Sequence, residues 1–411
     1  MKILIGTVDV CGWINLLSEE LKRQGHEVIN ISEPNKFNPE YKFDIDPKNY
    51  AKDFLKCLQK KKPFKAFILK TALKILGQKT DSRIKNFIYN YSRNFFSDYC
   101  DVFIYLWNGI ATDESDLILF KKKGKKIITW FVGDDVRDYP TMQKHFNISN
   151  NFYDGYFKKS FKELVNKLRM HEKYADIIYS LPDQASLALR PYYHLQIPVQ
   201  LSRFKFNITN NTVPVVVHIP SSPQIKGTEI IRKAIHELKN DGVEFVYKEL
   251  INIPNKKVLE ELSDADILVD ELYLHGPGVL SFEAMASGCA VATRHIEKSP
   301  QCFSPPVIAI TEINVRDKIK LLVTNNELRN DLINKGKAYV EANNSVERIV
   351  SLMMKNLLDE GTPDYYPDYL TKDYLPSSEV TDFLNAQTAF VQNEDWYKSN
   401  IKQKERAGLK F

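Results

Sequence analysis

Short apolar runs alternate with segments of helical spacing along most of the chain. Near its start, an apolar run at 2–5 leads into a loop at 6–12, a helical pattern at 14–21 and a second apolar run at 26–31. A strand, a helix and a strand in this order predict two parallel strands joined by a right-handed crossover. The alternation resumes further on, with strands expected at 101–107, 125–131 and 176–180 and helices at 113–123 and 157–174.

A second alternating block begins at residue 215. Strands are expected at 215–219, 243–248, 265–269 and 290–293, helices at 228–240, 256–262 and 279–286, and further helix over 312–358. Two such blocks predict an α/β chain made of two doubly wound, Rossmann-like domains. Ligands bind outside the carboxyl ends of parallel strands, so we expect the two domains to face a ligand-binding cleft.

The two blocks suggest where the domains begin and end. We expect an N-terminal domain over 1–205, a linker over 206–213 and a C-terminal domain over 214–360. The tail over 361–411 is rich in Tyr, Pro and Asp, with a helix near 378–391. We expect this tail to pack back on the N-terminal domain.

A basic insertion at about 34–98 interrupts the first block. Between 51 and 95 the chain has twelve Lys or Arg and two Asp, with apolar residues interleaved, and Pro63 and Gly77 are expected to divide it into short helices. This mixture suits a helix that lies on an anionic membrane surface. A basic groove for an acidic glycan is the alternative, whereas no nucleic-acid-binding module is visible.

Composition limits the class of protein. The 411 residues carry 57 Lys and Arg against 52 Asp and Glu, a net charge of +5 that is too small to indicate nucleic acid as a partner. The five cysteines are odd in number and far apart, with no C-x-x-C pair, which argues against a disulfide framework and a zinc ribbon. Neither a secretory signal nor an apolar stretch of 18 residues is visible. We therefore expect a reduced, cytoplasmic protein, either soluble or peripheral on the inner face of the membrane.

The segment 266–288 has the strongest pattern for chemistry. A buried strand ends at Asp270, and a glycine-bearing loop then opens a helix near Val279. Unpaired N–H groups at a helix start favour a phosphate, and Glu283, one turn further, is placed to accept hydrogen bonds from a ribose diol. The alternative is an ordinary strand–loop–helix unit whose glutamate faces solvent.

The segment 215–228 has a second strand–loop–helix pattern, in which Lys226, Gly227 and Thr228 open a helix. A lysine at a helix start opposes the helix dipole, and an anion such as a diphosphate would compensate it. The alternative is a solvated lysine.

Polar residues also follow a strand of the first block. Asp134 or Asp135 could accept the proton of a hydroxyl or bind a sugar hydroxyl, and Arg137 could pair with one of them. The alternative is a helix cap and a surface salt bridge. His171 and His218 are interpreted as structural, and the scattered histidines give no metal-ligand spacing.

Several of these segments together resemble GT-B glycosyltransferases of the family 4 type, also called glycosyltransferase group 1. The strand leading to Lys226-Gly227 and the Glu-Ala-Met-Ala-Ser-Gly helix at 283–288 carry most of the resemblance. Gly-His-Glu-Val at 25–28 and Phe-Val-Gly-Asp-Asp-Val-Arg at 131–137 look like landmarks of polysaccharide-building members. The resemblance covers most of 1–30 and 100–355.

The resemblance implies a metal-independent hexosyltransferase without a cofactor. Its C-terminal domain would bind a nucleotide-sugar, and its N-terminal domain would bind a cell-surface glycan or lipid-linked saccharide that receives the sugar with retention. From the resemblance, Lys226, Gly227, Thr228, Gly278, Val279 and Leu280 would bind the diphosphate and Glu283 the ribose. Together with the residues argued from position, the candidate catalytic residues are Asp134, Asp135, Lys226 and Glu283. The candidate donor-binding residues are Ser221, Ser222, Lys226, Gly227, Thr228, Asp270, His275, Gly278, Val279, Leu280 and Glu283. The candidate acceptor-binding residues are Asp9, Gly12, Trp13, Gly133, Asp134 and Arg137.

Two positions depart from the family pattern and leave other functions open. His275 stands where the family often has a glutamate that holds the donor sugar, and Ser221 stands where it usually has an arginine. A catalytically silent protein that binds a glycan or a partner would keep the fold without these residues. A nucleotide-sugar epimerase is a second alternative, although no clear set of histidines and carboxylates supports it.

Overall fold

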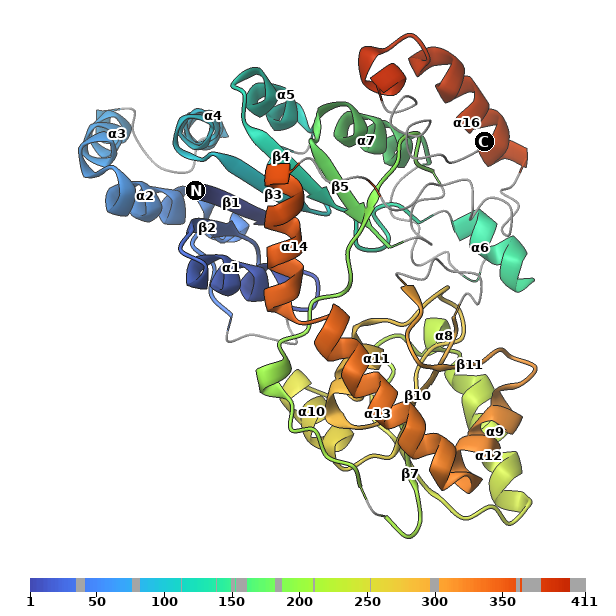
Figure 1. Ribbon diagram of the computed structural model, residues 1–411. Helices are drawn as coiled ribbons and strands as arrows, with labels where there is room; N and C mark the ends of the chain where they lie inside the picture. The colour runs from blue at the N-terminus through green and yellow to red at the C-terminus, as the bar shows by residue number, and fades with distance from the viewer. Residues whose placement is uncertain are drawn as a thin grey trace. The chain divides into compact units, whose positions relative to one another are not determined.

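The computed structural model forms two compact units. Unit 1 comprises Met1–His194 and Met354–Phe411, and unit 2 comprises Leu195–Met353 (Figure 1). The structure describes residues 1–34, 41–75, 82–111, 113–137, 139–148, 152, 161–181, 187–209, 211–251, 253–295, 303–359, 363 and 378–399.

Unit 1 is built on a six-stranded parallel sheet in the order β2-β1-β3-β4-β5-β6. Its strands are β1 (Lys2–Thr7), β2 (Glu27–Ile31), β3 (Val102–Leu106), β4 (Lys126–Trp130), β5 (Ile177–Ser180) and β6 (Tyr193–His194). All five residues of β3 are buried, as expected of a parallel strand with both faces covered. The chain passes from β1 to β2 on one side and returns to β3 on the other, so the strand order reverses at β1.

Helices surround this sheet. They are α1 (Trp13–Arg23), α5 (Ser115–Lys122), α6 (Tyr139–Phe146), α7 (Phe161–Tyr174) and α16 (Ser378–Val391), with the end of α14 (Val346–Asp359). The helix expected near 378–391 is confirmed. The helix expected from 157 is described from Phe161 onward, since 157–160 lie outside the described residues.

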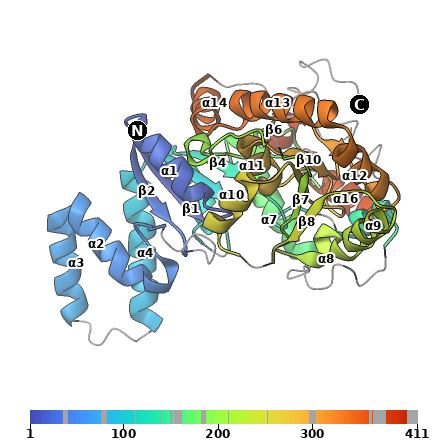
Figure 2. The same cartoon turned by 90° about the horizontal axis from the view of Figure 1, so that it is seen from below.

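Within its described residues, the basic insertion forms three helices at the β2 edge of the sheet (Figure 2). These are α2 (Tyr50–Lys61), preceded by the short turn η1 (Pro47–Asn49), then α3 (Pro63–Ile75) and α4 (Ser82–Tyr99). The break at Pro63 is confirmed, because proline fits the first turn of a helix and α3 begins there. Gly77 lies outside the described residues. The expectation of short helices throughout is wrong for α4, which contains neither Pro nor Gly and extends over 18 residues.

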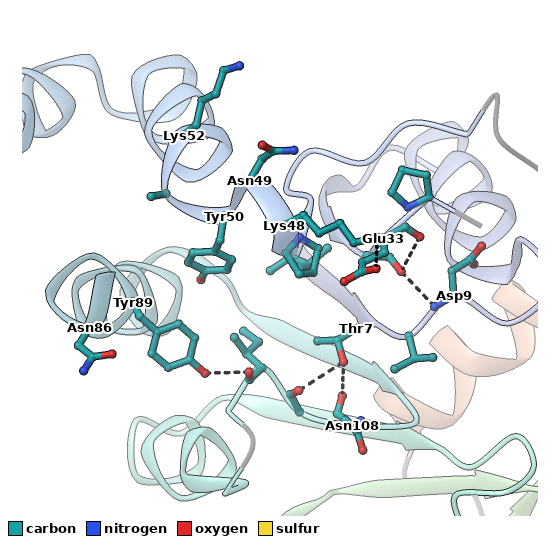
Figure 3. Close-up of a pocket in the computed structure, with 18 of the residues that line it drawn as sticks. Thr7, Asp9, Glu33, Lys48, Asn49, Tyr50, Lys52, Asn86, Tyr89 and Asn108 are labelled. Carbon is teal, nitrogen blue, oxygen red and sulfur yellow. Dashed lines mark hydrogen bonds and ion pairs between the residues drawn. The ribbon is translucent and has the colours of Figure 1, made fainter. Parts of the chain in front are cut away.

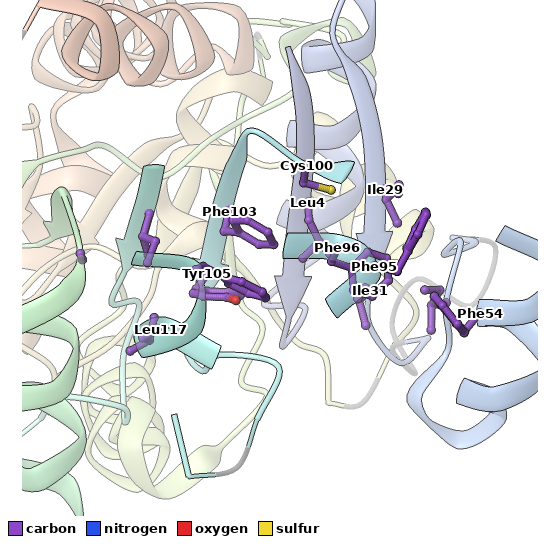
Figure 4. Close-up of a cluster of buried hydrophobic side chains, with 14 of the residues drawn as sticks. Leu4, Ile29, Ile31, Phe54, Phe95, Phe96, Cys100, Phe103, Tyr105 and Leu117 are labelled. Atoms are coloured by element: carbon purple, nitrogen blue, oxygen red, sulfur yellow. The ribbon is translucent and has the colours of Figure 1, made fainter. Parts of the chain in front are cut away.

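The insertion shares the hydrophobic core of unit 1. Phe54 on α2 and Phe95 and Phe96 on α4 are buried and lie in one cluster with Leu4 and Phe103 of the sheet (Figure 4). The Phe54 ring centroid lies 5.8 Å from that of Phe95 and 5.6 Å from that of Phe96. Helices α2 and α4 are therefore held by apolar packing and are integral parts of this unit.

Unit 2 has a five-stranded parallel sheet in the order β11-β10-β9-β7-β8. Its strands are β7 (Val215–His218), β8 (Val246–Glu249), β9 (Ile267–Val269), β10 (Ala290–Thr293) and β11 (Ile308–Ala309). The helices are α8 (Pro223–Lys226), α9 (Thr228–Asn240), α10 (Asn255–Ser263), α11 (Val279–Ser287), α12 (Val315–Thr324) and α13 (Asn326–Asn343), with a short turn η3 (Leu201–Arg203).

The predicted α/β class with two doubly wound sheets is confirmed. Strand β8 was expected from Val243 and begins at Val246. The Val243 N–H donates to Leu238 O, so this residue belongs to the turn that ends α9. Among the described residues, no helix is long and apolar enough to cross a membrane.

Candidate functional site

Two loops of unit 2 lie against each other at the carboxyl ends of the neighbouring strands β7 and β9. One is the connection from β7 to α9, which contains the short helix α8, and the other joins β9 to α11. The Tyr273 N–H donates to Ile225 O at 3.2 Å, which links them directly. Gly227 has φ +70°, and a Cβ there would lie 2.6 Å from Leu272 Cδ1. Only glycine fits this close approach in this backbone conformation. The structure thus brings together the two strand–loop–helix segments, 215–228 and 266–288, that the sequence pattern indicated.

Lys226 joins the two loops through buried charges. Its ammonium group donates to the Asp270 carboxylate and, at 3.0 Å, to Glu271 Oε2. The second oxygen of Asp270 accepts a hydrogen bond from Ser281 Oγ at 2.6 Å. Burial alone would lower the pKa of Lys226, but attraction to Asp270 and Glu271 outweighs it and raises the pKa above its usual value. Lys226 is therefore a charged, buried group with two carboxylate partners.

This arrangement corrects the reasoning about Lys226 from the sequence. Lys226 is the last residue of α8 and precedes the start of α9, so its charge lies at the favourable end of a helix. It is only 9% exposed, so the alternative of a solvated lysine is also wrong. Asp270 and Glu271 supply the compensating negative charge, and no external anion is required for it.

The start of α11 lies beside this ion cluster. Gly278 is its N-cap residue and has no side chain that could accept from the first N–H groups of the helix, at Val279 and Leu280. A Cβ on Gly278 would lie 3.5 Å from Glu271 Oε1, so the Glu271 carboxylate is a close neighbour of this helix end. Glu271 was not among the predicted site residues, although an acidic pair directly after a buried strand was a visible signal.

Glu283, one turn into α11, has an unusual environment. It is partly buried, and burial raises its pKa to about 7, although Arg203 and a hydrogen bond with Asn255 oppose the shift. Arg203 Nη2 in turn donates to Asn255 Oδ1 at 2.8 Å. The alternative of a solvent-facing glutamate is therefore wrong. Arg203 and Asn255 were missed because they come from a separate loop and helix with no motif of their own.

The other predicted donor-site residues differ in accessibility. Ser221 is exposed and Ser222 is the N-cap residue of α8, whereas His275 is buried in the loop before α11. Thr228 is also buried, with its hydroxyl 2.9 Å from His218 Nε2. The His218 Nδ1 lies 2.8 Å from Val269 O. The structural interpretation of His218 is thus confirmed.

In unit 1, Asp134 and Asp135 have different surroundings. Asp135 is buried and accepts hydrogen bonds from the Gly133 N–H at 2.7 Å and the Val132 N–H at 3.1 Å. Its role in this structure is to hold the loop after β4. Asp134 is more exposed, pairs with Arg137 at 2.9 Å and accepts a hydrogen bond from the Tyr139 hydroxyl. Asp134 is therefore the carboxylate of the two that solvent or a ligand can reach.

The loop after β1 holds the remaining predicted acceptor residues. Asp9 Oδ1 accepts from the Ile14 N–H at 2.9 Å, and burial raises the pKa of this carboxyl group. Gly12 has φ +85°, which glycine adopts without strain. Trp13 is buried, and its ring centroid lies 5.1 Å from that of Trp130. Asp9 thus fixes the start of α1, and Trp13 belongs to the core beneath the loop.

A cavity of about 1050 Å³ opens beside Asp9 (Figure 3). It lies at the carboxyl ends of β1, β2 and β3, where the strand order reverses, which is the usual ligand-binding position of an open α/β sheet. Its polar lining comes from these strand ends and from the insertion: Thr7, Asp9, Ser32, Glu33, Lys48, Asn49, Tyr50, Lys52, Asn86, Tyr89, Asn108 and Glu114. Because half of this lining lies on η1, α2 and α4, the strand pattern of the sequence could not reveal it.

Hydrogen bonds and an ion pair connect the residues of the cavity wall. The Tyr89 hydroxyl donates to Ile110 O at 2.7 Å, and the Tyr50 and Ser92 hydroxyls are 2.6 Å apart. Lys48 forms an ion pair with Glu33 at 2.8 Å across the rim. In the part of the chain that the structure describes, no group of three His, Cys, Asp or Glu side chains is arranged to hold a metal ion.

The ion cluster predicts a strong effect of Lys226 on stability. Lys226→Met leaves Asp270 and Glu271 buried without their cation, and we expect a loss of about 3 kcal/mol in the unfolding free energy of unit 2. Chemical denaturation measures it, with Lys233→Met on the exposed face of α9 as the matched control. Equal stability of the two variants would contradict the structural role of the cluster.

The raised pKa of Glu283 predicts a pH-dependent stability. Its pKa is about 7 in the folded chain against an ordinary 4.5, so the folded state holds an extra proton between these values and stability falls as the pH rises through this window. Glu283→Gln removes this dependence. We expect it to melt several degrees above the parent at pH 8 and at the same temperature near pH 4.5, with Glu244→Gln unchanged at both. A constant difference at all pH values would show that Glu283 does not titrate in this range.

The chain was compared with protein families, with curated proteins and with solved structures. No protein-family model matches the sequence, and no curated protein matches it. Among solved structures, sucrose-phosphate synthase from Thermosynechococcus elongatus is 11% identical over 88% of this chain and 98% of that one, with a TM-score of 0.55. WaaG, a glycosyltransferase involved in lipopolysaccharide biosynthesis, is 11% identical over 87% and 99%, with a TM-score of 0.46. UDP-GlcNAc 2-epimerase from Neisseria meningitidis, bound to UDP-GlcNAc, is 12% identical over 87% and 100%, with the same TM-score. The likeness to the synthase extends over nearly all of both chains, and the chain thus has the glycosyltransferase-like GT-B fold.

Proposed function

We propose that this chain transfers a hexosyl group from a nucleotide-sugar to a saccharide acceptor without a metal ion. The single observation that carries the proposal is the start of α11, where uncapped N–H groups at Val279 and Leu280 lie beside the Lys226 cluster and one turn before Glu283. These are groups that recognise a diphosphate and a ribose within one nucleotide.

The diphosphate is proposed to bind at the start of α11. The N–H groups of a helix start and the positive end of its dipole stabilise negative charge, and that charge grows on the diphosphate as the sugar leaves. The Lys226 ammonium group adds a positive charge beside the carboxylates of Asp270 and Glu271. Those carboxylates would repel the diphosphate, and the positive charge of Lys226 reduces that repulsion.

The ribose is proposed to bind Glu283. An ionised carboxylate accepts two hydrogen bonds from a diol, and Arg203 and Asn255 beside it stabilise the ionised form. With a pKa of about 7 in the absence of ligand, part of the population is protonated at neutral pH. We therefore propose that binding of a nucleotide is accompanied by loss of a proton from Glu283.

The acceptor is proposed to bind in the cavity of unit 1. Its hydroxyl, amide and carboxylate lining offers hydrogen-bond partners for a sugar, and the two tyrosines at 50 and 89 offer faces on which a sugar ring can pack. Asp134 follows β4 and is not part of the cavity lining, so we propose that the acceptor extends from the cavity toward the loop after β4. Asp134 would accept the proton of the attacking hydroxyl there, since Asp135 is committed to backbone N–H groups. A cell-surface glycan or a lipid-linked saccharide is the proposed acceptor, and retention is proposed from the family resemblance.

Calorimetric titration with UDP, GDP, ADP and CDP tests the donor site. We expect at least one of them to bind, and Glu283→Gln to weaken that binding at least ten-fold, because hydrogen bonds to a charged group contribute about 1.5–3 kcal/mol each. Glu244→Gln is the matched control and keeps the parent affinity. A proton released on binding to the parent chain and absent for Glu283→Gln would support the proposed ionisation.

Two outcomes would contradict the proposal. If none of the four nucleotides binds at millimolar concentration, the chain is a silent relative that keeps the fold for another purpose. If incubation with a nucleotide-sugar alone yields its epimer, the reaction is an isomerisation and not a transfer.

A further inference from the structure

Helix α3 turns an apolar stripe toward solvent. Phe64, Phe67 and Ile68 are 74%, 68% and 51% exposed, respectively. Their spacing of three and four residues puts them on one face of the helix. In Figure 2, α3 lies on the outer side of the insertion, next to α2. Large apolar side chains grouped at such exposure mark an interaction surface.

The stripe is not needed to fold the insertion. The opposite face of α3 carries Ala66 and Leu69, which are 1% and 2% exposed and belong to the core cluster shared with α2 and the sheet. Phe64, Phe67 and Ile68 are therefore additional to the residues that hold α3 in place.

Lysines border the stripe on both sides. Successive residues of an α-helix are rotated by about 100° around its axis. Viewed along the axis, Lys65 and Lys70 therefore lie about 110° on either side of the centre of the stripe. Both lysines are exposed. Lys70 also donates a hydrogen bond to Gln59 Oε1 at 2.6 Å. The segment 50–75 contains eight lysines and a single acidic residue, Asp53.

We propose that α3 is a docking surface for an anionic phospholipid membrane. The apolar side chains would enter the boundary between head groups and acyl chains, while Lys65 and Lys70 would extend along their alkyl stems to the lipid phosphates. The uniform positive charge favours a lipid surface over a protein partner, because lysine is depleted in protein interfaces. The proposal does not rest on the proposed sugar transfer, although it would bring the chain to lipid-linked acceptors.

Vesicle co-sedimentation tests the proposal. The full chain is mixed with phosphatidylcholine vesicles that contain 30% phosphatidylglycerol, and with vesicles of phosphatidylcholine alone. We expect binding to the anionic vesicles that weakens with salt. Lys65→Gln with Lys70→Gln should lower the partition coefficient about 25-fold, at about five-fold for each lysine near the surface.

The apolar part of the surface is tested separately. Phe64→Ser with Phe67→Ser should lower binding at least ten-fold and leave the melting temperature unchanged, since both side chains are exposed. Ile313→Ser in unit 2, at a residue that is 94% exposed, is the matched control and should bind like the parent chain.

Three results would overturn the proposal. The parent chain could fail to bind anionic vesicles, or both double variants could bind as tightly as the parent. Alternatively, the parent could self-associate and become monomeric through Phe64→Ser with Phe67→Ser, in which case a second copy covers the stripe.

Discussion

The buried attraction between Lys226 and the carboxylates of Asp270 and Glu271 determines the geometry of unit 2's candidate site. The three groups come from two loops that are distant in sequence, and each would be costly to bury alone. Together they hold the α8–α9 junction against the loop that opens α11. The start of α11 is thereby fixed beside a cluster in which Lys226 offsets part of the charge of two carboxylates. The proposed nucleotide binding follows from the uncapped N–H groups of this helix start and from Glu283.

Unit 1 is organised by apolar packing. Phe54, Phe95 and Phe96 anchor α2 and α4 to the sheet edge, and the same helices carry Tyr50 and Tyr89 into the cavity wall. The insertion thus has two consequences: its inner face completes a cavity where the strand order reverses, and the outer face of α3 stays apolar and basic. One basic segment can do both because its helices bury one face against the sheet and expose the other to solvent.

The fold was largely predictable from the sequence, and the candidate site only in part. The spacing of apolar residues distinguishes strands from helices. The predicted bounds of α9 and β10 accordingly agree with the structure to the residue. Motif spacing also indicated the start of α11 and Glu283. The partners of Lys226 could not be inferred, because an ion pair between residues 44 and 45 positions apart depends on how two loops pack. The cavity of unit 1 could not be inferred either, because its lining depends on how η1, α2 and α4 pack beside the strand ends.

Hydrogen exchange of the backbone N–H groups of unit 2, measured with and without a nucleoside diphosphate at saturating concentration, is the most direct test of the central claim. If the start of α11 receives the diphosphate, Val279 and Leu280 should exchange more slowly with the ligand present, together with the loop at Gly227. Slower exchange elsewhere in the chain with no change at these positions would contradict the account, because the nucleotide would then bind away from the junction that the Lys226 cluster builds.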